Sequence, residues 1–157
     1  MHQRAKPPFD RWPEQLVDSR FGRAWFCRPA VFVNQLQVEQ ATVETVNALH
    51  DAIDTVLARR RAEIAAAGGI IMIHDWRELR GYTPDARKVY LDRMRSREPG
   101  YLKVAVAVVP DTPFLRMAIQ TANILMALRI GGSLELTLDP DAVLRRYDVA
   151  TPLPGWP

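Results

Sequence analysis

The sequence has a single cysteine, few aromatic residues and no long uninterrupted apolar run. Only Cys27 carries a thiol among the 157 residues, and aromatic side chains make up 8 %. One thiol cannot form a disulfide within the chain or supply the cysteine pairs of a zinc site, so we expect a reducing, cytoplasmic setting. The most apolar stretch, residues 113–130, is interrupted by Arg116, Arg129 and other polar residues, and this polarity argues against an integral membrane span.

The sequence also lacks an apolar leader and a large excess of one charge. Residues 1–4 run into prolines rather than into an apolar segment, so no signal peptide is expected. The 21 basic and 18 acidic residues give a net charge of +3, which is too small an excess to predict nucleic-acid binding. The three histidines include no pair spaced four residues apart, and we therefore expect no metal and no other cofactor.

Length and composition are typical of one globular domain with irregular ends. Hydrophobic residues make up 48 % of the chain and charged residues 25 %, as in ordinary globular domains. Prolines among charges indicate an extended N-terminal arm over residues 1–15, and further prolines indicate a Pro-rich C-terminal tail over residues 149–157. The folded domain is expected between them, at residues 16–148.

Apolar runs alternate with helical periodicities between the two ends. Apolar residues at three- and four-residue spacing over residues 39–67 predict a long helix, which a Gly-Gly pair ends. The unbroken apolar run at residues 70–73 predicts a strand that is covered on both faces. Thr83 followed by Pro84 is typical of a helix start.

The full pattern predicts an α/β fold. The expected order is β-β-α-β-α-β-α-β-α, and helices between strands are typical of crossover connections. We therefore expect a mixed, largely parallel sheet of four to five strands with helices packed on it. The expected strands are residues 23–27, 30–33, 70–73, 102–109 and 134–138, and the expected helices are residues 39–67, 84–98, 113–129 and 139–146.

One junction carries more information than any other segment. The apolar strand at residues 70–73 is followed by His74 and Asp75, by a polar loop and by the helix that begins after Thr83. In α/β domains, ligands, phosphates and partners bind where strands end and helices begin. We therefore expect function at this junction, although no residue pattern in it names a reaction.

The same junction resembles the STAS-like superfamily, in particular small bacterial proteins likened to anti-sigma-factor antagonists and to CRAL-TRIO domains. The resemblance is carried by the strand end at residues 74–77, the loop at residues 79–82, the helix start at residues 84–87, the strand at residues 104–109 and the helix at residues 117–128. It extends over about residues 16–148.

The resemblance implies a STAS-like fold and a non-enzymatic regulatory module for protein–protein interaction. It further implies a bacterial cytoplasmic protein that binds a partner or a second copy of itself. In antagonists of this kind, a phosphorylatable Ser or Thr lies at the start of the helix after the Asp-ending strand, where helix N–H groups favour a phosphate. This sequence departs from the pattern, because Asp85 falls near the position of the modified hydroxyl and Thr83 lies two residues earlier in a capping role.

Arginines flank the junction and indicate an anionic ligand or partner. Residues 77–98 contain seven basic and four acidic side chains, and the guanidinium group matches the geometry of carboxylates and phosphates. The alternative is a solvated helix face with paired charges. The residues expected to bind are Asp75, Trp76, Arg77, Arg80, Tyr82, Thr83, Asp85 and Arg87.

Four side chains raise the alternative of a small hydrolase-type enzyme. His74 could act as a base with Asp75. However, adjacent strand residues point to opposite faces, so Asp75 is expected to accept N–H bonds from the following loop and His74 to pack at the sheet edge. His50 is interpreted as a boundary residue on a helix flank. Cys27 is interpreted as a buried structural thiol rather than a nucleophile.

The helix expected at residues 113–129 is apolar on more than one side, and such a helix has to be covered on both. The cover is expected to be the N-terminal arm or a neighbouring helix, a second subunit or partner, or a small apolar, lipid-like ligand. Binding of such a ligand beside this helix is the second functional alternative.

Overall fold

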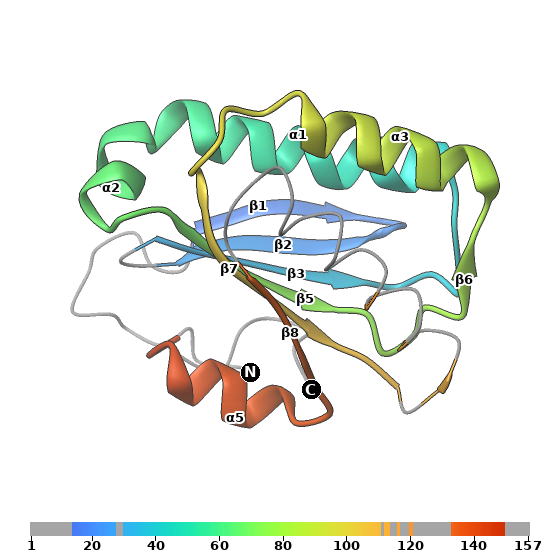
Figure 1. Cartoon of the computed structure of the whole chain (residues 1–157). Helices are drawn as coiled ribbons and strands as arrows, with labels where there is room; N and C mark the ends of the chain where they lie inside the picture. Colours follow the sequence, from blue (N-terminus) through green and yellow to red (C-terminus); the bar gives the residue numbers. More distant parts are fainter. Residues whose placement is uncertain are drawn as a thin grey trace.

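Six stretches of the chain pair into one mixed sheet (Figure 1). In this computed structural model, the described residues are 14–27, 30–110, 112, 113, 116, 120 and 133–149, without the side chains of residues 14–19 and 133. The strands of the sheet are β1 (Glu14–Ser19), β2 (Gly22–Cys27), β3 (Val31–Leu36), β5 (Ile70–Asp75), β7 (Leu102–Val108) and β8 (Ser133–Thr137). Their order across the sheet is β1-β2-β3-β5-β7-β8.

The pairing gives the sheet an antiparallel half and a parallel half. β1, β2 and β3 pair antiparallel, whereas β3, β5, β7 and β8 are parallel neighbours. The five expected strands are present, and the expected α/β class with a mixed, largely parallel sheet is confirmed. β1 is an additional strand at the sheet edge, and it begins at Glu14, inside the expected arm.

Helices lie on both faces of the sheet. They are α1 (Val43–Arg59), α2 (Arg61–Ala66), α3 (Pro84–Arg95) and α5 (Pro140–Arg146). α1 and α3 cover one face, and α5 lies on the opposite face (Figure 1). Right-handed crossovers between parallel strands that follow one another across the sheet place their helices on the same face, which accounts for the positions of α1 and α3.

The helix expected over residues 39–67 differs from the observed structure at its start and in its middle. Gln40–Ala41 form a short strand, β4, so α1 starts only after Thr42, whose side chain accepts the backbone N–H of Thr45. At Arg60 the backbone has φ −112° and ψ 20°, which separates α1 from α2. The sequence periodicity continues across this break and therefore did not predict it.

Several expectations concern residues outside those described. These residues are the first 13 residues of the arm, most of the helix expected at residues 113–129, and residues 150–157 of the tail. What covers that helix therefore stays a prediction.

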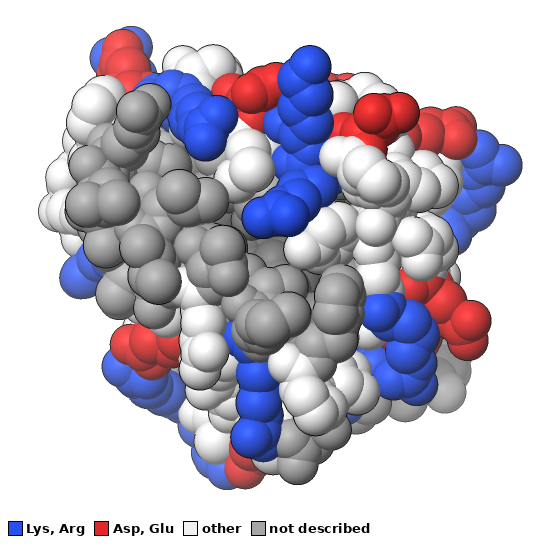
Figure 2. Space-filling model, turned by 45° about the vertical axis from the view of Figure 1, so that its right-hand side comes forward, with Lys and Arg blue, Asp and Glu red and all other residues white. Residues whose placement is uncertain are grey.

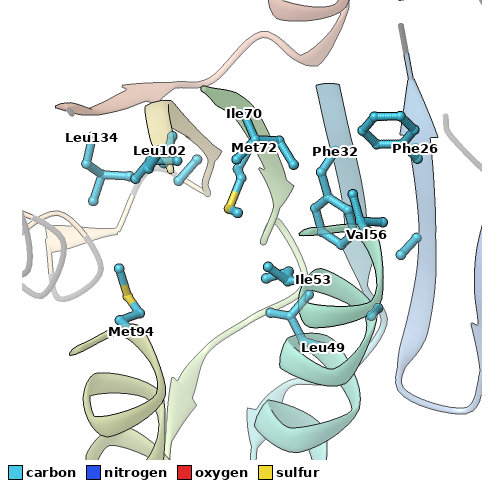
Figure 3. Packing of buried hydrophobic residues seen from close by; sticks show 14 of the residues in the cluster. Phe26, Phe32, Leu49, Ile53, Val56, Ile70, Met72, Met94, Leu102 and Leu134 are labelled. Carbon is cyan, nitrogen blue, oxygen red and sulfur yellow. The ribbon is translucent and has the colours of Figure 1, made fainter. Parts of the chain in front are cut away.

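Apolar side chains fill both faces of the sheet. On one face, Phe32 and Met72 belong to the same core cluster as Leu49 and Ile53 of α1 (Figure 3). On the other face, a second cluster joins the strands to α5, and its members include Trp25, Val33, Ile73, Val106, Val143 and Leu144. β5 is covered on both faces, as its unbroken apolar run predicts.

Gly22 starts β2 in a position that excludes a side chain. Its φ is +147°, and a Cβ atom there would lie 1.9 Å from the backbone oxygen of Gln35. Gly22→Ala is expected to lower the free energy of unfolding by about 3 kcal/mol or more, because β2 or β3 has to move to relieve the overlap. Urea denaturation measures this loss.

Gly68 provides the matched control for Gly22. Its φ is +78°, but nothing lies within 4 Å of an added Cβ atom. Gly68→Ala is therefore expected to cost only about 1 kcal/mol, which is the penalty of the left-handed backbone itself. Equal losses for the two variants would contradict the overlap at Gly22.

Candidate functional site

Four buried polar side chains lie together at the carboxyl ends of β3 and β5. Asn34 is opposite His74, and Gln35 is opposite Asp75, in the parallel pairing. Because successive strand residues face opposite sides, Asn34 and His74 point to the face of α1, whereas Gln35 and Asp75 point to the face of α5. We call these four residues the polar quartet. They occupy the end of the sheet at which α/β domains bind ligands and partners.

Asp75 anchors the loop that follows β5. Its Oδ1 accepts the backbone N–H of Arg77 at 3.2 Å and the Nε–H of Arg77 at 2.8 Å. Its Oδ2 accepts hydrogen bonds from Nη2 of Arg77 at 2.7 Å and from Nε2 of Gln35 at 3.2 Å. The hydrogen bond to Asp75 raises the pKa of Arg77. The expectation that Asp75 accepts N–H bonds from the loop is confirmed, and the carboxylate is engaged on both oxygens.

On the opposite face, Asn34 and His74 form a buried pair. Nδ1 of His74 is hydrogen-bonded to Oδ1 of Asn34, and Nδ1 carries the proton because an amide oxygen can only accept. Trp76 stacks on His74 with ring centroids 5.0 Å apart. Burial lowers the pKa of His74 from 6.5 to about 4, which keeps the ring neutral near pH 7. His74 lies on a central strand, so the prediction that it packs at the sheet edge is wrong.

His50 belongs to the core. It is 1 % exposed and meets the ring of Tyr90 edge to face, with centroids 5.0 Å apart. Neither ring nitrogen has a hydrogen-bond partner among the described residues. Burial lowers the pKa of His50 to about 3, and the charges of Arg97 and Arg93 contribute to the lowering. The interpretation of His50 as a boundary residue is wrong, because α1 turns this side chain inward toward α3.

Two loops meet at the carboxyl end of the sheet. β4 (Gln40–Ala41) follows β3, β6 (Gly81–Tyr82) follows β5, and the two short strands pair in parallel. The backbone N–H of Arg80 donates to the backbone oxygen of Glu39 at 2.8 Å. We call residues 76–83 the rim loop. Its backbone is held against the segment that leads into α1.

Both helices that start at this end of the sheet have capped N-termini. The hydroxyl of Thr42 accepts the backbone N–H of Thr45 at 3.4 Å, and the hydroxyl of Thr83 accepts the backbone N–H of Ala86 at 3.2 Å. Pro84 occupies the first turn of α3. The helix start predicted from the Thr-Pro pair is confirmed.

The eight residues expected to bind differ in their accessibility. Arg80, Asp85 and Arg87 are exposed, whereas Asp75 is buried. The half-buried members are Trp76, Arg77, Tyr82 and Thr83. All eight lie in one segment, from the end of β5 to the first turns of α3. Asp75 is a support of the rim loop and offers no free carboxylate to a ligand.

Arginines of α3 and of the turn after it form ion pairs with acidic residues of α1. Arg93 bonds Asp51 at 2.8 Å and Asp54 at 2.6 Å. Arg97, just after α3, bonds Asp54 at 2.7 Å. These arginines clamp α1 to α3, so they do not form part of an anion site.

Arg80 and Arg87 differ from the clamping arginines. Both are exposed, and within the described part of the chain neither side chain forms an ion pair or a hydrogen bond. Figure 2 brings forward the side of the molecule on which β6 lies in Figure 1, and it shows basic side chains interspersed with acidic ones. The predicted anion site is thereby reduced to these two arginines, because Arg77 is bound to Asp75.

The described residues provide neither a reactive thiol nor a metal site. Cys27 is fully buried, and burial raises the pKa of its thiol, so the interpretation as a structural thiol is confirmed. Within residues 14–27, 30–110 and 133–149, no group of three His, Cys, Asp or Glu side chains is placed to hold a metal ion. Across these ranges, no helix has both the length and the apolar character that crossing a bilayer requires.

The sequence did not predict Asn34 and Gln35 as site residues, because the expected strand ends at residue 33. In the structure, β3 continues to Leu36. A signal for them is present in the sequence. In both β3 and β5, an apolar run is followed by two polar residues. Parallel neighbours end on the same side of a sheet, so this matching pattern brings the two polar pairs together.

These features define an α/β domain with polar side chains buried at the carboxyl ends of its central strands. No protein-family model, no curated protein and no solved structure matches the chain. The STAS-like assignment therefore rests on the residue pattern of the sequence and stays a prediction.

Proposed function

We propose that this chain is a regulatory, non-enzymatic module of the STAS-like kind that binds another protein through the rim loop and the start of α3. The observation that carries the proposal is the fixed rim loop, which is paired to β4 and displays Arg80, followed by the first turn of α3, which displays Arg87. A loop whose backbone is already ordered loses little conformational entropy on binding. This favours recognition of a partner.

The chemistry of the rim loop and of the first turn of α3 favours an acidic partner surface. The guanidinium groups of Arg80 and Arg87 match carboxylates in charge and in geometry. Trp76 and Tyr82 are half-buried aromatic residues in the same loop, and aromatic residues are enriched at interfaces. Exposed charges mainly set the rate and orientation of association, so binding should weaken as salt is added.

An enzymatic function of His74 and Asp75 has less support. His74 is buried and neutral, and Asp75 is bound to Arg77. A general base has to reach the proton that it removes. Binding of an apolar ligand beside residues 113–129 stays the alternative function, and it concerns residues outside those described.

Charge reversal at the rim loop and at the first turn of α3 tests the proposal. Arg80→Glu combined with Arg87→Glu is expected to weaken binding of the partner, or self-association, by about tenfold or more, because attraction is replaced by repulsion. The measurement is affinity capture with the tagged chain, then titration of the isolated partner. Sedimentation velocity covers self-association.

The matched control carries the same change in net charge at another place. Arg59→Glu combined with Arg61→Glu alters the last turn of α1 and the first residue of α2, and it should leave binding unchanged. Thermal unfolding verifies that all variants are folded. Equal loss of binding in both double variants, or full binding by the rim-loop variant at low salt, would refute the proposal.

A further inference from the structure

The exposed charges around the rim loop are balanced in sign. The backbone oxygen of Glu39 accepts the N–H groups of Arg80 at 2.8 Å and of Gly81 at 3.2 Å, so residue 39 lies against the rim loop. We call the exposed charged side chains of residue 39, of the rim loop and of the start of α3 the rim charges. The acidic members are Glu39, Glu78 and Asp85, and the basic members are Arg80, Arg87 and Lys88. This surface therefore carries many charges but no net charge.

The rim charges have no charged partners within the described part of the chain. None of the six side chains forms an ion pair or a hydrogen bond there. Exposed charges elsewhere do pair within the molecule, since Arg20 bonds Glu44 at 2.7 Å and Arg146 bonds Glu135 at 2.6 Å. The side of the molecule that Figure 2 brings forward shows acidic side chains among basic ones. The rim charges are therefore available for pairing with another molecule.

A surface that binds a second copy of itself has to be self-complementary. In a two-fold contact the same patch is present on both sides, so each cation needs a carboxylate at the position that the symmetry brings opposite to it. Equal numbers of both signs meet this requirement, whereas a patch of one sign repels its own copy. A purely acidic partner would be repelled by the three carboxylates of the rim. A second copy offers acidic and basic groups in matching numbers.

We infer that the partner bound at the rim is a second copy of this chain, held in a two-fold contact. The inference rests on the proposed function, because it names the partner of the same surface. The cations of each copy face the carboxylates of the other. Trp76 and Tyr82, the half-buried aromatic residues of the rim loop, contribute apolar contact. Exposed ion pairs each contribute little free energy, so the dimer is weak and salt dissociates it.

Two opposite charge reversals test the inference by sedimentation velocity at low salt. The wild type is expected to form a dimer that dissociates on dilution. Arg80→Glu with Arg87→Glu makes the rim charges net negative, and Glu39→Arg with Glu78→Arg makes them net positive by the same amount. Each double variant alone should dimerise about tenfold or more weakly, because its copies repel each other. An equimolar mixture of the two should form a heterodimer, because their rims attract each other.

A control variant separates the rim from a general effect of charge. Arg59→Glu with Arg61→Glu changes the net charge as much as the net-negative variant does, but away from the rim. It should dimerise like the wild type and form no heterodimer with the net-positive variant. Thermal unfolding verifies that every variant is folded.

Three outcomes would overturn the inference. They are a wild type that stays monomeric at low salt, a rim variant that dimerises like the wild type, and a mixture of the two rim variants that forms no heterodimer. A monomeric wild type that binds a different protein through Arg80 and Arg87 would overturn the inference and leave the proposed function intact.

Discussion

Lowering the pH from 7 to 4 is expected to destabilise the protein by about 3 kcal/mol for each of His50 and His74. Burial lowers their pKa values to about 3 and about 4, whereas an unfolded histidine has a pKa near 6.5. The unfolded state therefore binds more protons than the folded state within this range. The stabilisation is fully present above pH 6.5 and is lost as the pH falls toward the folded pKa values.

Urea denaturation at a series of pH values measures this loss. Each buried histidine should contribute a slope of about 1.4 kcal/mol per pH unit between the two pKa values. His50→Leu removes two ring nitrogens that have no partner among the described residues, so it should be nearly neutral at pH 7. It should also remove about half of the slope that the two histidines produce. An unchanged slope in this variant would contradict the burial of a neutral His50.

Arg77→Ala is expected to lower the free energy of unfolding by about 3 kcal/mol, because it leaves a buried carboxylate without its charged partner. The side chain of Asp75 is 3 % exposed, and it would retain only the bonds from Gln35 and from the backbone of residue 77. The side chain of Arg77 is 31 % exposed, so water can replace part of the lost contact, and the expected loss lies at the low end for buried pairs.

Arg80→Ala is the control for Arg77→Ala. Arg80 is an exposed arginine of the same rim loop, and its removal should change stability by less than about 0.5 kcal/mol. Asp75→Ala combined with Arg77→Ala should cost less than the sum of the two single changes, since the pair is coupled. Equal losses for Arg77→Ala and Arg80→Ala in urea denaturation would show that the Asp75–Arg77 pair is not a support of the loop.

Much of the fold follows from local patterns. The apolar run at residues 70–73 predicts a strand covered on both faces, and β5 is such a strand. Thr83 and Pro84 predict the start of α3. In each case the signal is contained within a few neighbouring residues, because backbone preferences and side-chain alternation act over that distance.

The site depends on contacts between segments that are distant in the sequence, so it is less predictable. His50 is buried because α3 packs beside α1, and the spacing of residues in α1 does not show how wide that contact is. Which arginines stay free also depends on distant partners. Arg93 and Arg97 are paired with acidic residues of α1, whereas Arg87 is not.

The two-residue pairing of β4 with β6 links the connection that follows β3 to the connection that follows β5. A Cβ atom at Gly81 would lie 3.3 Å from Oε1 of Gln40, so a larger residue at position 81 requires the side chain at position 40 to shift. Gly81 belongs to the rim loop, and Gln40 belongs to the segment that leads into α1. A substitution at one of these two positions therefore has to be accommodated by the side chain at the other.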